Sequence, residues 1–546
     1  MVIALGSAYL LAGAFHGNIW FDESYSLAIS NHSISDIIRI GSADVHPVLY
    51  YIALWILRQV SGGGILACRL FSVAGSISLG LLGFGCVRRD YGQRVGAMFS
   101  FLALFTPYVS HMSVEIRMYS WCAFAVTLCF IFAARIYRVC CRDAQSARIP
   151  LSWWVTFHAA SLASAYLHYF GTICALFIVV ALYAGITRTH ADRSVRAGLV
   201  VGAVLQVLCY LPWLIIFLRQ IVKVESGFWI TVRYPDALVQ AVLFPFIDPW
   251  VADAVASAFG LPCGVAIGSI YSKPDPFAIS LAMLCVLAAV FAYRRDRRCR
   301  GGLQLFASLM VSTLVLSAIG KPIFQYRYLY VAIGPLLLSC AQALFGSSDD
   351  SRVKPKVRNR PAAGRGSSIG MFYHARLVAL AAKPFAPVGI IGVLLVLSIT
   401  GKFKLIETLY SPQNIEPVQE LREQGTAIHS VWTQDASCMG LLAITAPERR
   451  INFVDRWSQQ LAYEAYSPGI NFYQAGNWGM HMRGERFNVI SRYAGIESEV
   501  SHRSVIRQTH IDLNKSFDNR FIIRSDKALF RPYEQVWYIV SEVEEC

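Results

Sequence analysis

Long apolar runs constrain this chain more than any other feature of its sequence. A run of about 20 apolar residues is long enough to cross the hydrocarbon core of a bilayer. A first segment, from Val2 to about Gly17, is interpreted as an uncleaved helix, and with it the runs predict about eleven transmembrane helices. The other runs lie at residues 66–87, 95–112, 119–138, 152–167, 171–187, 197–218, 277–293, 302–319, 327–345 and 378–400.

The composition agrees with a membrane protein and argues against two other classes. Of the 546 residues, 55% are hydrophobic and 15% are charged, and the mean hydropathy of +0.47 is too apolar for a soluble protein of this length. The net charge is +15, but the arginines form short clusters between apolar runs. We therefore expect no nucleic-acid partner. The 14 cysteines show no spacing typical of a zinc site.

The arginine clusters also decide whether the short apolar run at 47–60 crosses the membrane. If it does not cross, every strong basic cluster lies on one side, which the positive-inside rule makes cytoplasmic. We therefore predict that 47–60 forms an interfacial or half-inserted helix. The clusters are Arg88, Arg89 and Arg94; Arg138, Arg142 and Arg148; Arg188, Arg193 and Arg196; Arg294, Arg295, Arg297, Arg298 and Arg300; and the linker from Arg352 to Arg376.

Four regions follow from this topology. They are a transmembrane domain at 1–345, a basic cytoplasmic linker at 346–377, a final transmembrane helix at 378–401, and a soluble α/β domain outside the membrane at 402–546. In the last region we expect strands near 450–455, 486–490, 520–523 and 536–540, and helices near 416–424 and 458–466. Cys438 and Cys546 lie in that region, and whether they pair is left open.

The unusual polar residues all fall on the predicted outer face. Asp22 and Glu23 follow the first helix, and His46 ends the sequence Asp44-Val45-His46 just before Pro47. Charged residues wedged between membrane helices face a cavity more often than lipid. Structural alternatives stand beside this interpretation, because carboxylates are commonly solvated and Tyr, His and Arg commonly anchor at interfaces. The remaining candidates are Glu115, Arg117, Tyr119, His168, Tyr169, Lys321, Tyr326 and Arg327.

The order of these motifs resembles the GT-C glycosyltransferases of the protein O-mannosyltransferase and aminoarabinose transferase superfamily. Asp44-Val45-His46-Pro47 is similar to the Asp-Val-His-Pro-Pro-Leu motif of the O-mannosyltransferases, with Val48 in place of the second proline. The region is closer to bacterial members, which often have His-Pro-Pro-Leu-Tyr-Tyr where this chain has His46-Pro47-Val48-Leu49-Tyr50-Tyr51. The resemblance covers about residues 1–345 and implies a GT-C fold.

The resemblance also implies an activity. It predicts an inverting transferase that moves a sugar from a polyprenyl-phosphate donor to a glycan, lipid or protein acceptor. The reaction is expected on the extracytoplasmic face of a bacterial inner or plasma membrane. Asp22 matches the position of the family's catalytic base, and a carboxylate there would take the proton of the attacking hydroxyl. The leaving lipid phosphate needs a cation, for which Arg327 comes first and Lys321 and Arg117 follow. Glu23 is expected to orient either the acceptor or Asp22, and Glu115 and His46 are expected to line the acceptor side. A divalent metal is compatible but not required.

Two other classes compete with this interpretation. A transporter or lipid flippase should show ionisable residues near the middle of its helices or inverted repeats with broken helices, and the sequence shows neither clearly. A membrane-anchored binding protein would instead place its function in the tail at 402–546.

Overall fold

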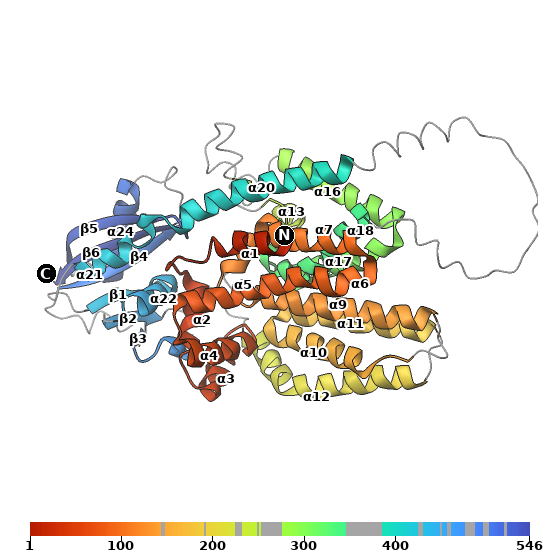
Figure 1. Ribbon diagram of the computed structural model, residues 1–546. Helices are drawn as coiled ribbons and strands as arrows, with labels where there is room; N and C mark the ends of the chain where they lie inside the picture. Colours follow the sequence, from red (N-terminus) through yellow and green to blue (C-terminus); the bar gives the residue numbers. More distant parts are fainter. Residues whose placement is uncertain are drawn as a thin grey trace, which may run out of the picture.

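The structure is a computed structural model in which a bundle of membrane-type helices carries a mixed β-sheet domain at one end (Figure 1). It describes residues 1–142, 148–189, 193–223, 232–247, 251–252, 276–320, 322–345, 385–423, 430–447, 450–455, 460–474, 486–494, 502–517, 521–534 and 536–545. The predicted basic linker at 346–377 lies outside the described residues, as do Lys321 and Cys546.

Within the described residues, eight helices are long and apolar enough to cross a membrane, or nine if one bent pair is a single span. This number is lower than the predicted eleven, because two predicted spans form shorter helices. Helix α1 (Val2–Leu11) has 10 residues and α10 (Leu151–Leu167) has 17. The long helices are α5 (Ile65–Leu82, continued by η1, Gly83–Val87, and α6, Arg88–Tyr91), α9 (Tyr119–Arg142), α11 (Tyr169–Arg188), α12 (Arg193–Lys223), α16 (Pro276–Arg295), α17 (Arg300–Ile319), η5 with α18 (Tyr326–Ala332 and Ile333–Phe345) and α20 (Phe385–Leu409).

The bent pair replaces the single straight span predicted at 95–112. Helix α7 (Gln93–Phe105) meets α8 (Pro107–Val114) at an angle of 58°. The cause is local: a residue before proline avoids helical backbone angles, and Thr106 is extended, with φ −61° and ψ 128°. Proline is well suited to the first position of the new helix. After the bend, α8 ends at Val114 and leads directly into the turn at Glu115.

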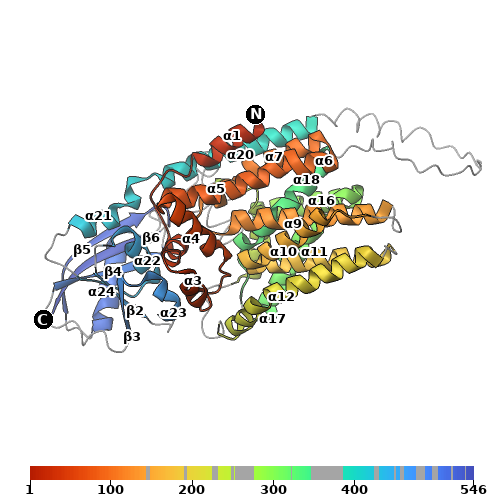
Figure 2. The same ribbon diagram turned by 60° about the horizontal axis from the view of Figure 1, so that its bottom comes forward.

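Three short helices lie between the bundle and the sheet, α2 (Phe21–Ile29), α3 (Ile34–Gly41) and α4 (Leu49–Ser61) (Figure 2). The 13 residues of α4 span about 20 Å at 1.5 Å per residue, less than the hydrocarbon core of a bilayer. Gly62, in the left-handed region at φ +74°, ends this helix. The prediction that 47–60 does not cross agrees with this length.

The basic turns lie at the helix ends away from these short helices. Figure 1 shows α6 at the end of the bundle opposite the sheet. There, Arg135 and Arg138 of α9 both bind Asp90 of α6, at 2.7 and 2.8 Å. Arg138, a member of one predicted basic cluster, therefore lies at the end of the bundle away from the sheet, and the sidedness of the clusters stays a prediction.

The C-terminal domain contains a six-stranded sheet with strand order β3-β2-β1-β4-β6-β5. The first three pairings are parallel and the last two antiparallel. The predicted strands correspond to β2 (Arg450–Asp455), β4 (Arg486–Ala494), β5 (Phe521–Arg531) and β6 (Val536–Glu545), and the predicted helices to α21 (Glu416–Glu423) and to α23 with η7 (Gln460–Tyr463 and Glu464–Tyr466). Not predicted were β1 (Ser430–Thr433), β3 (Ile470–Gln474), α22 (Ala436–Thr445) and α24 (His502–Phe517).

The boundary of this domain differs from the prediction. Helix α20 does not end at residue 401 but continues to Leu409, followed by the short turn η6 (Pro412–Asn414). The domain therefore begins about ten residues later along the chain than its predicted start.

Cys438, one of the two cysteines of this domain, is buried in α22 and forms no disulfide within the described residues.

Close helix packing in the bundle depends on glycine at Gly302, where a Cβ would overlap the carbonyl oxygen of Pro335 on α18. We expect Gly302→Ala to lower the free energy of unfolding by about 1–3 kcal/mol, because the two backbones must separate. Thermal unfolding in detergent measures the change. Gly389→Ala on α20 is the matched control, since a Cβ there meets no described atom within 4 Å, and equal effects of the two variants would contradict the expectation.

Candidate functional site

Helix α2 presents two adjacent carboxylates to different surroundings. Trp20 is the N-cap residue and has extended backbone angles, and Asp22 and Glu23 occupy the first turn, where the positive end of the helix dipole favours negative charge. Successive helical residues are separated by about 100° around the axis. Asp22 and Glu23 therefore point in different directions.

Glu23 is part of a fully buried ion pair with Arg69 of α5, with Nη1 2.7 Å from Oε1 and neither side chain exposed. Three further protein groups donate to the carboxylate, namely the backbone N–H of Ile116 at 3.0 Å, that of Trp20 at 3.3 Å and the hydroxyl of Tyr533 at 2.9 Å. A buried carboxylate is stable only when its oxygens are satisfied in this way. We propose a structural role for Glu23 in place of the predicted contact with substrate.

Asp22 forms an ion pair with Arg327 of η5. Arg327 Nη2 lies 3.2 Å from Asp22 Oδ2, and the two side chains are 14% and 19% exposed. The guanidinium carbon also lies over the rings of Trp20 and Tyr328, at 5.1 and 5.5 Å from their centroids. These contacts bring together, across 305 positions of sequence, the two residues predicted as base and phosphate ligand.

Arg117 is a second buried cation beside Asp22. Its Nη1 lies 3.3 Å from each of three oxygens, the backbone carbonyl of Asp22, the hydroxyl of Ser26 and the hydroxyl of Tyr51. Its Nη2 lies 3.2 Å from His46 Nε2. A guanidinium only donates, so His46 Nε2 accepts and its proton sits on Nδ1.

The proton on His46 Nδ1 faces Asp44, whose Oδ2 lies 3.4 Å away. Burial opposes ionisation of Asp44, yet the hydrogen bond from His46 and the charge of Arg117 keep the pKa of this carboxyl below its ordinary value. Asp44 is therefore linked to Arg117 through His46. The predicted His46 is brought into the site, and Asp44 and Tyr51 join it.

His168 is buried beside this network and holds an unused donor. Its Nδ1 accepts the backbone N–H of Phe170 at 3.1 Å, so its proton is on Nε2. Burial, followed by the charges of His46, Arg117 and Arg327, holds the pKa of His168 well below its ordinary value. His168 Nε2 has no hydrogen-bond partner within the described residues. A neutral imidazole with a free N–H is suited to donate to a ligand oxygen.

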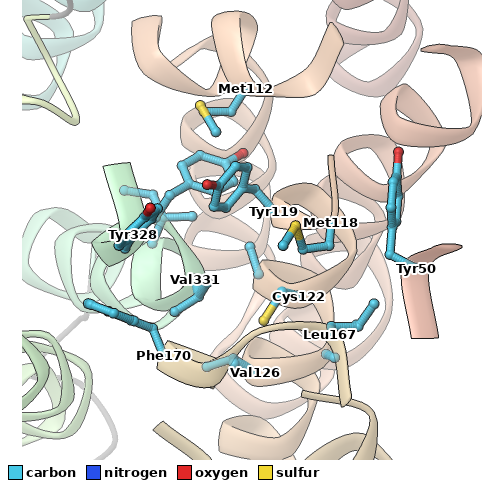
Figure 3. Close-up of a cluster of buried hydrophobic side chains, with 14 of the residues drawn as sticks. Tyr50, Met112, Met118, Tyr119, Cys122, Val126, Leu167, Phe170, Tyr328 and Val331 are labelled. Atoms are coloured by element: carbon cyan, nitrogen blue, oxygen red, sulfur yellow. The ribbon is translucent and has the colours of Figure 1, made fainter. Parts of the chain in front are cut away.

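Tyr119 and Tyr328 form a wall of the site next to His168, with ring centroids 5.5 and 5.2 Å from the imidazole. Figure 3 shows both tyrosines above an apolar cluster that includes Cys122 of α9 and Phe170 of α11. The Tyr119 hydroxyl is buried and, like His168 Nε2, has no partner among the described groups. Buried polar atoms of this kind call for a ligand or a water molecule.

The other predicted residues, Glu115, Tyr326 and Tyr169, contact groups other than Asp22 and Arg327. Glu115 Oε1 is 3.4 Å from His111 Nε2, and its Oε2 finds no donor in the described chain. The ring of Tyr326 packs on Tyr108, at 6.0 Å between centroids. The Tyr169 hydroxyl instead binds Gln220 and accepts from Trp213 Nε1 at 3.2 Å, which makes Tyr169 an anchor of α12.

No group of three His, Cys, Asp or Glu side chains among the described residues is placed to hold a metal ion. The carboxylate of Asp22 faces Arg327, His46 contacts Arg117, and Asp44 contacts His46. Two guanidinium groups thus supply the positive charge of the site as described. The site residues that sequence reasoning did not name as candidates are Arg69, Tyr51, Ser26 and Tyr533. Two of them carried a signal, Arg69 as a charge inside an apolar run and Tyr51 as part of the motif that follows His46.

No protein-family model and no curated sequence matches this chain. Among solved structures, ArnT from Cupriavidus metallidurans in the apo state is similar, with a TM-score of 0.55 and 14% identity over 99% of this chain and 96% of that chain. ArnT from Cupriavidus metallidurans bound to undecaprenyl phosphate gives a TM-score of 0.51 and 15% identity over 99% and 97%. The chain has the fold of ArnT, which confirms the predicted GT-C fold.

The buried pair of Glu23 and Arg69 yields a test of its structural role. We expect Arg69→Met to lower the free energy of unfolding by about 3–5 kcal/mol, because it leaves Glu23 buried without its counter-charge. Chemical unfolding in detergent measures the loss. Arg39→Met removes a surface arginine that is 51% exposed and should change stability little; comparable losses in both variants would contradict the role assigned to the pair.

Proposed function

We propose that this chain is an inverting glycosyltransferase that moves a sugar from a polyprenyl-phosphate donor to an acceptor hydroxyl or amine on the extracytoplasmic face of the membrane. The observation that carries the proposal is the pair of Asp22 and Arg327, a carboxylate and a guanidinium 3.2 Å apart at the end of the membrane helices. The ArnT fold supports it, since one of the two similar structures is bound to undecaprenyl phosphate.

The chemistry requires a base and a cation, and the site offers one of each. In the reaction, Asp22 accepts the proton of the acceptor while the acceptor heteroatom forms a bond to the anomeric carbon. The bond from that carbon to the phosphate oxygen breaks, and the lipid phosphate leaves with the electron pair. Arg327 neutralises the developing charge, because a guanidinium matches phosphate oxygens with two parallel donors. A single displacement of this kind inverts the anomeric carbon.

The contacts of the free protein fit this sequence of events. Without substrate, Arg327 is the counter-ion of Asp22, so the carboxylate is held in place and partly neutralised. An entering phosphate competes with Asp22 for Arg327, and its arrival leaves the carboxylate free to take a proton. Arg117, His168 Nε2–H and the Tyr119 hydroxyl are the further donors for phosphate or sugar oxygens. Glu115, with one oxygen without a described donor, would accept from a sugar hydroxyl.

Asp22→Asn tests the role of the base directly. The amide cannot take a proton, so we expect kcat for transfer from a polyprenyl-phosphate sugar to fall by about 10²–10⁴-fold. The assay uses purified protein in proteoliposomes with donor and product separated by chromatography. Asp36→Asn on α3 is the control, since Asp36 is an exposed carboxylate outside the site. Near-normal transfer by a folded Asp22→Asn protein would remove Asp22 as the base.

Arg327→Lys tests the role of the phosphate ligand. Lysine keeps the charge but loses the planar fork, so we expect kcat to fall by about 10²–10³-fold and the donor KM to rise. Both kcat and the donor KM are measured by varying the donor concentration at saturating acceptor. An unchanged donor KM with unchanged kcat would assign the phosphate to Arg117 or to Lys321, which lies outside the described residues. Arg524→Lys on β5, 50% exposed and paired with Glu544, controls for the substitution itself.

A further inference from the structure

The turn between β5 and β6 reaches from the C-terminal domain to the start of α2. Arg531, fully enclosed at the end of β5, donates from Nη2 to the carbonyl of Ile19 at 2.7 Å and from Nε to the carbonyl of Asn414 at 3.0 Å. The backbone N–H of Tyr533 donates to Asn414 Oδ1 at 2.8 Å. These bonds fix the turn against both the segment before α2 and the end of α20.

Tyr533 extends from this turn to the buried carboxylate of Glu23. Its hydroxyl donates to Glu23 Oε2 at 2.9 Å, across 510 positions of sequence. Burial, followed by the charge of Glu23, raises the pKa of the Tyr533 hydroxyl well above its ordinary value, so it stays protonated and remains a donor. The ring is held separately, by an edge contact with His16 at 5.8 Å. The hydroxyl therefore contributes an interaction that the ring does not.

Glu23 connects the two backbone segments that carry Asp22 and Arg117. Asp22 is the preceding residue in α2, and Ile116, whose N–H donates to Glu23 Oε1, is the residue before Arg117. This one carboxylate therefore contacts the backbone of both segments. Oε1 also receives Arg69 Nη1, and Oε2 receives Trp20 and Tyr533. Of the donors described, Tyr533 is the one supplied by the C-terminal domain.

We propose that Tyr533 is a positioning residue for the transfer reaction, through which the C-terminal domain holds Asp22 and Arg117 in their reactive arrangement. The inferred effect on rate rests on the proposed function. The link from the C-terminal domain through Tyr533 and Glu23 to the segments of Asp22 and Arg117 is a property of the fold. Tyr533 touches no substrate in this scheme. It acts through Glu23, and its loss should alter the rate of the chemical step more than the binding of donor.

The first test compares Tyr533→Phe with Tyr410→Phe in the full-length protein in proteoliposomes. Tyr410 is a suitable control because its hydroxyl also joins distant segments, binding the carbonyl of Ala12 and the N–H of Phe15 at 2.9 and 3.0 Å, without contacting Glu23. We expect Tyr533→Phe to lower kcat about tenfold, the factor for one charge-assisted hydrogen bond, with donor KM within about twofold. Tyr410→Phe should leave both near wild-type values.

The second test does not depend on enzymatic activity. It measures hydrogen exchange of the backbone amides in nanodiscs, to show whether Tyr533 stabilises the segments that carry Asp22 and Arg117. Tyr533→Phe should speed exchange in residues 18–29 and 114–118 severalfold and leave residues 169–188 unchanged, whereas Tyr410→Phe should leave the first two segments unchanged. Unchanged exchange in both segments overturns the proposal. So does a fall in kcat that is equal in the two variants, or one that merely follows the amount of folded protein.

The two tests separate the positioning role from the proposed function. If wild-type protein transfers no sugar, the proposed function fails, and the exchange experiment still decides whether Tyr533 holds the two segments. If the wild type transfers sugar and Asp22→Asn does not, a normal kcat for Tyr533→Phe overturns the positioning role alone.

Discussion

The ion pair of Glu23 and Arg69 is the interaction on which the rest of the site depends. Two charges with no exposed surface are costly to bury, and each must be satisfied by groups that the fold brings together. Arg69 also donates to the carbonyls of Val114 and Asn18. The pair thus joins the segment before α2, the end of α8, helix α5 and the C-terminal domain. Among the attached elements are α2, which carries Asp22, and the turn after α8, which carries Arg117.

Two neighbouring carboxylates have separate roles because of their surroundings. Glu23 is saturated by protein donors, which leaves it no capacity for a ligand. Asp22, one position earlier, has a single side-chain partner described, Arg327, and remains partly exposed. The same division appears between the two arginines, since Arg117 is bound by four protein groups while Arg327 packs on aromatic rings beside Asp22. Glu23 thus holds the site together, whereas Asp22 and Arg327 form the pair on which the proposed chemistry rests.

Features set by local sequence could be predicted, and features set by tertiary contacts could not. The apolar runs predicted most membrane helices because a bilayer imposes a minimum length on each run. The bend between α7 and α8 escaped notice although Pro107 marks it, since the run remained apolar across the break. Strands β1 and β3, of four and five residues, are too short for an alternating pattern to be recognised. Asp22, His46 and Arg327 stood out as polar residues beside apolar runs, and the family resemblance then assigned Asp22 the role of base. The saturation of Glu23 and the anchoring of Tyr169 by Gln220 instead depend on distant residues that no motif reveals.

The contact between Tyr533 and Glu23 has a consequence for how the protein is made. Translation proceeds at about 5–20 residues per second, and N-terminal parts fold first. The 510 positions between these residues therefore correspond to a delay of roughly half a minute to two minutes at that rate. During this interval the membrane helices can insert while the carboxylate of Glu23 lacks one of its donors. A nascent chain would then carry its polar residues at the membrane surface before Tyr533 has joined Glu23. Their arrangement would be complete only once the turn between β5 and β6 has reached the start of α2.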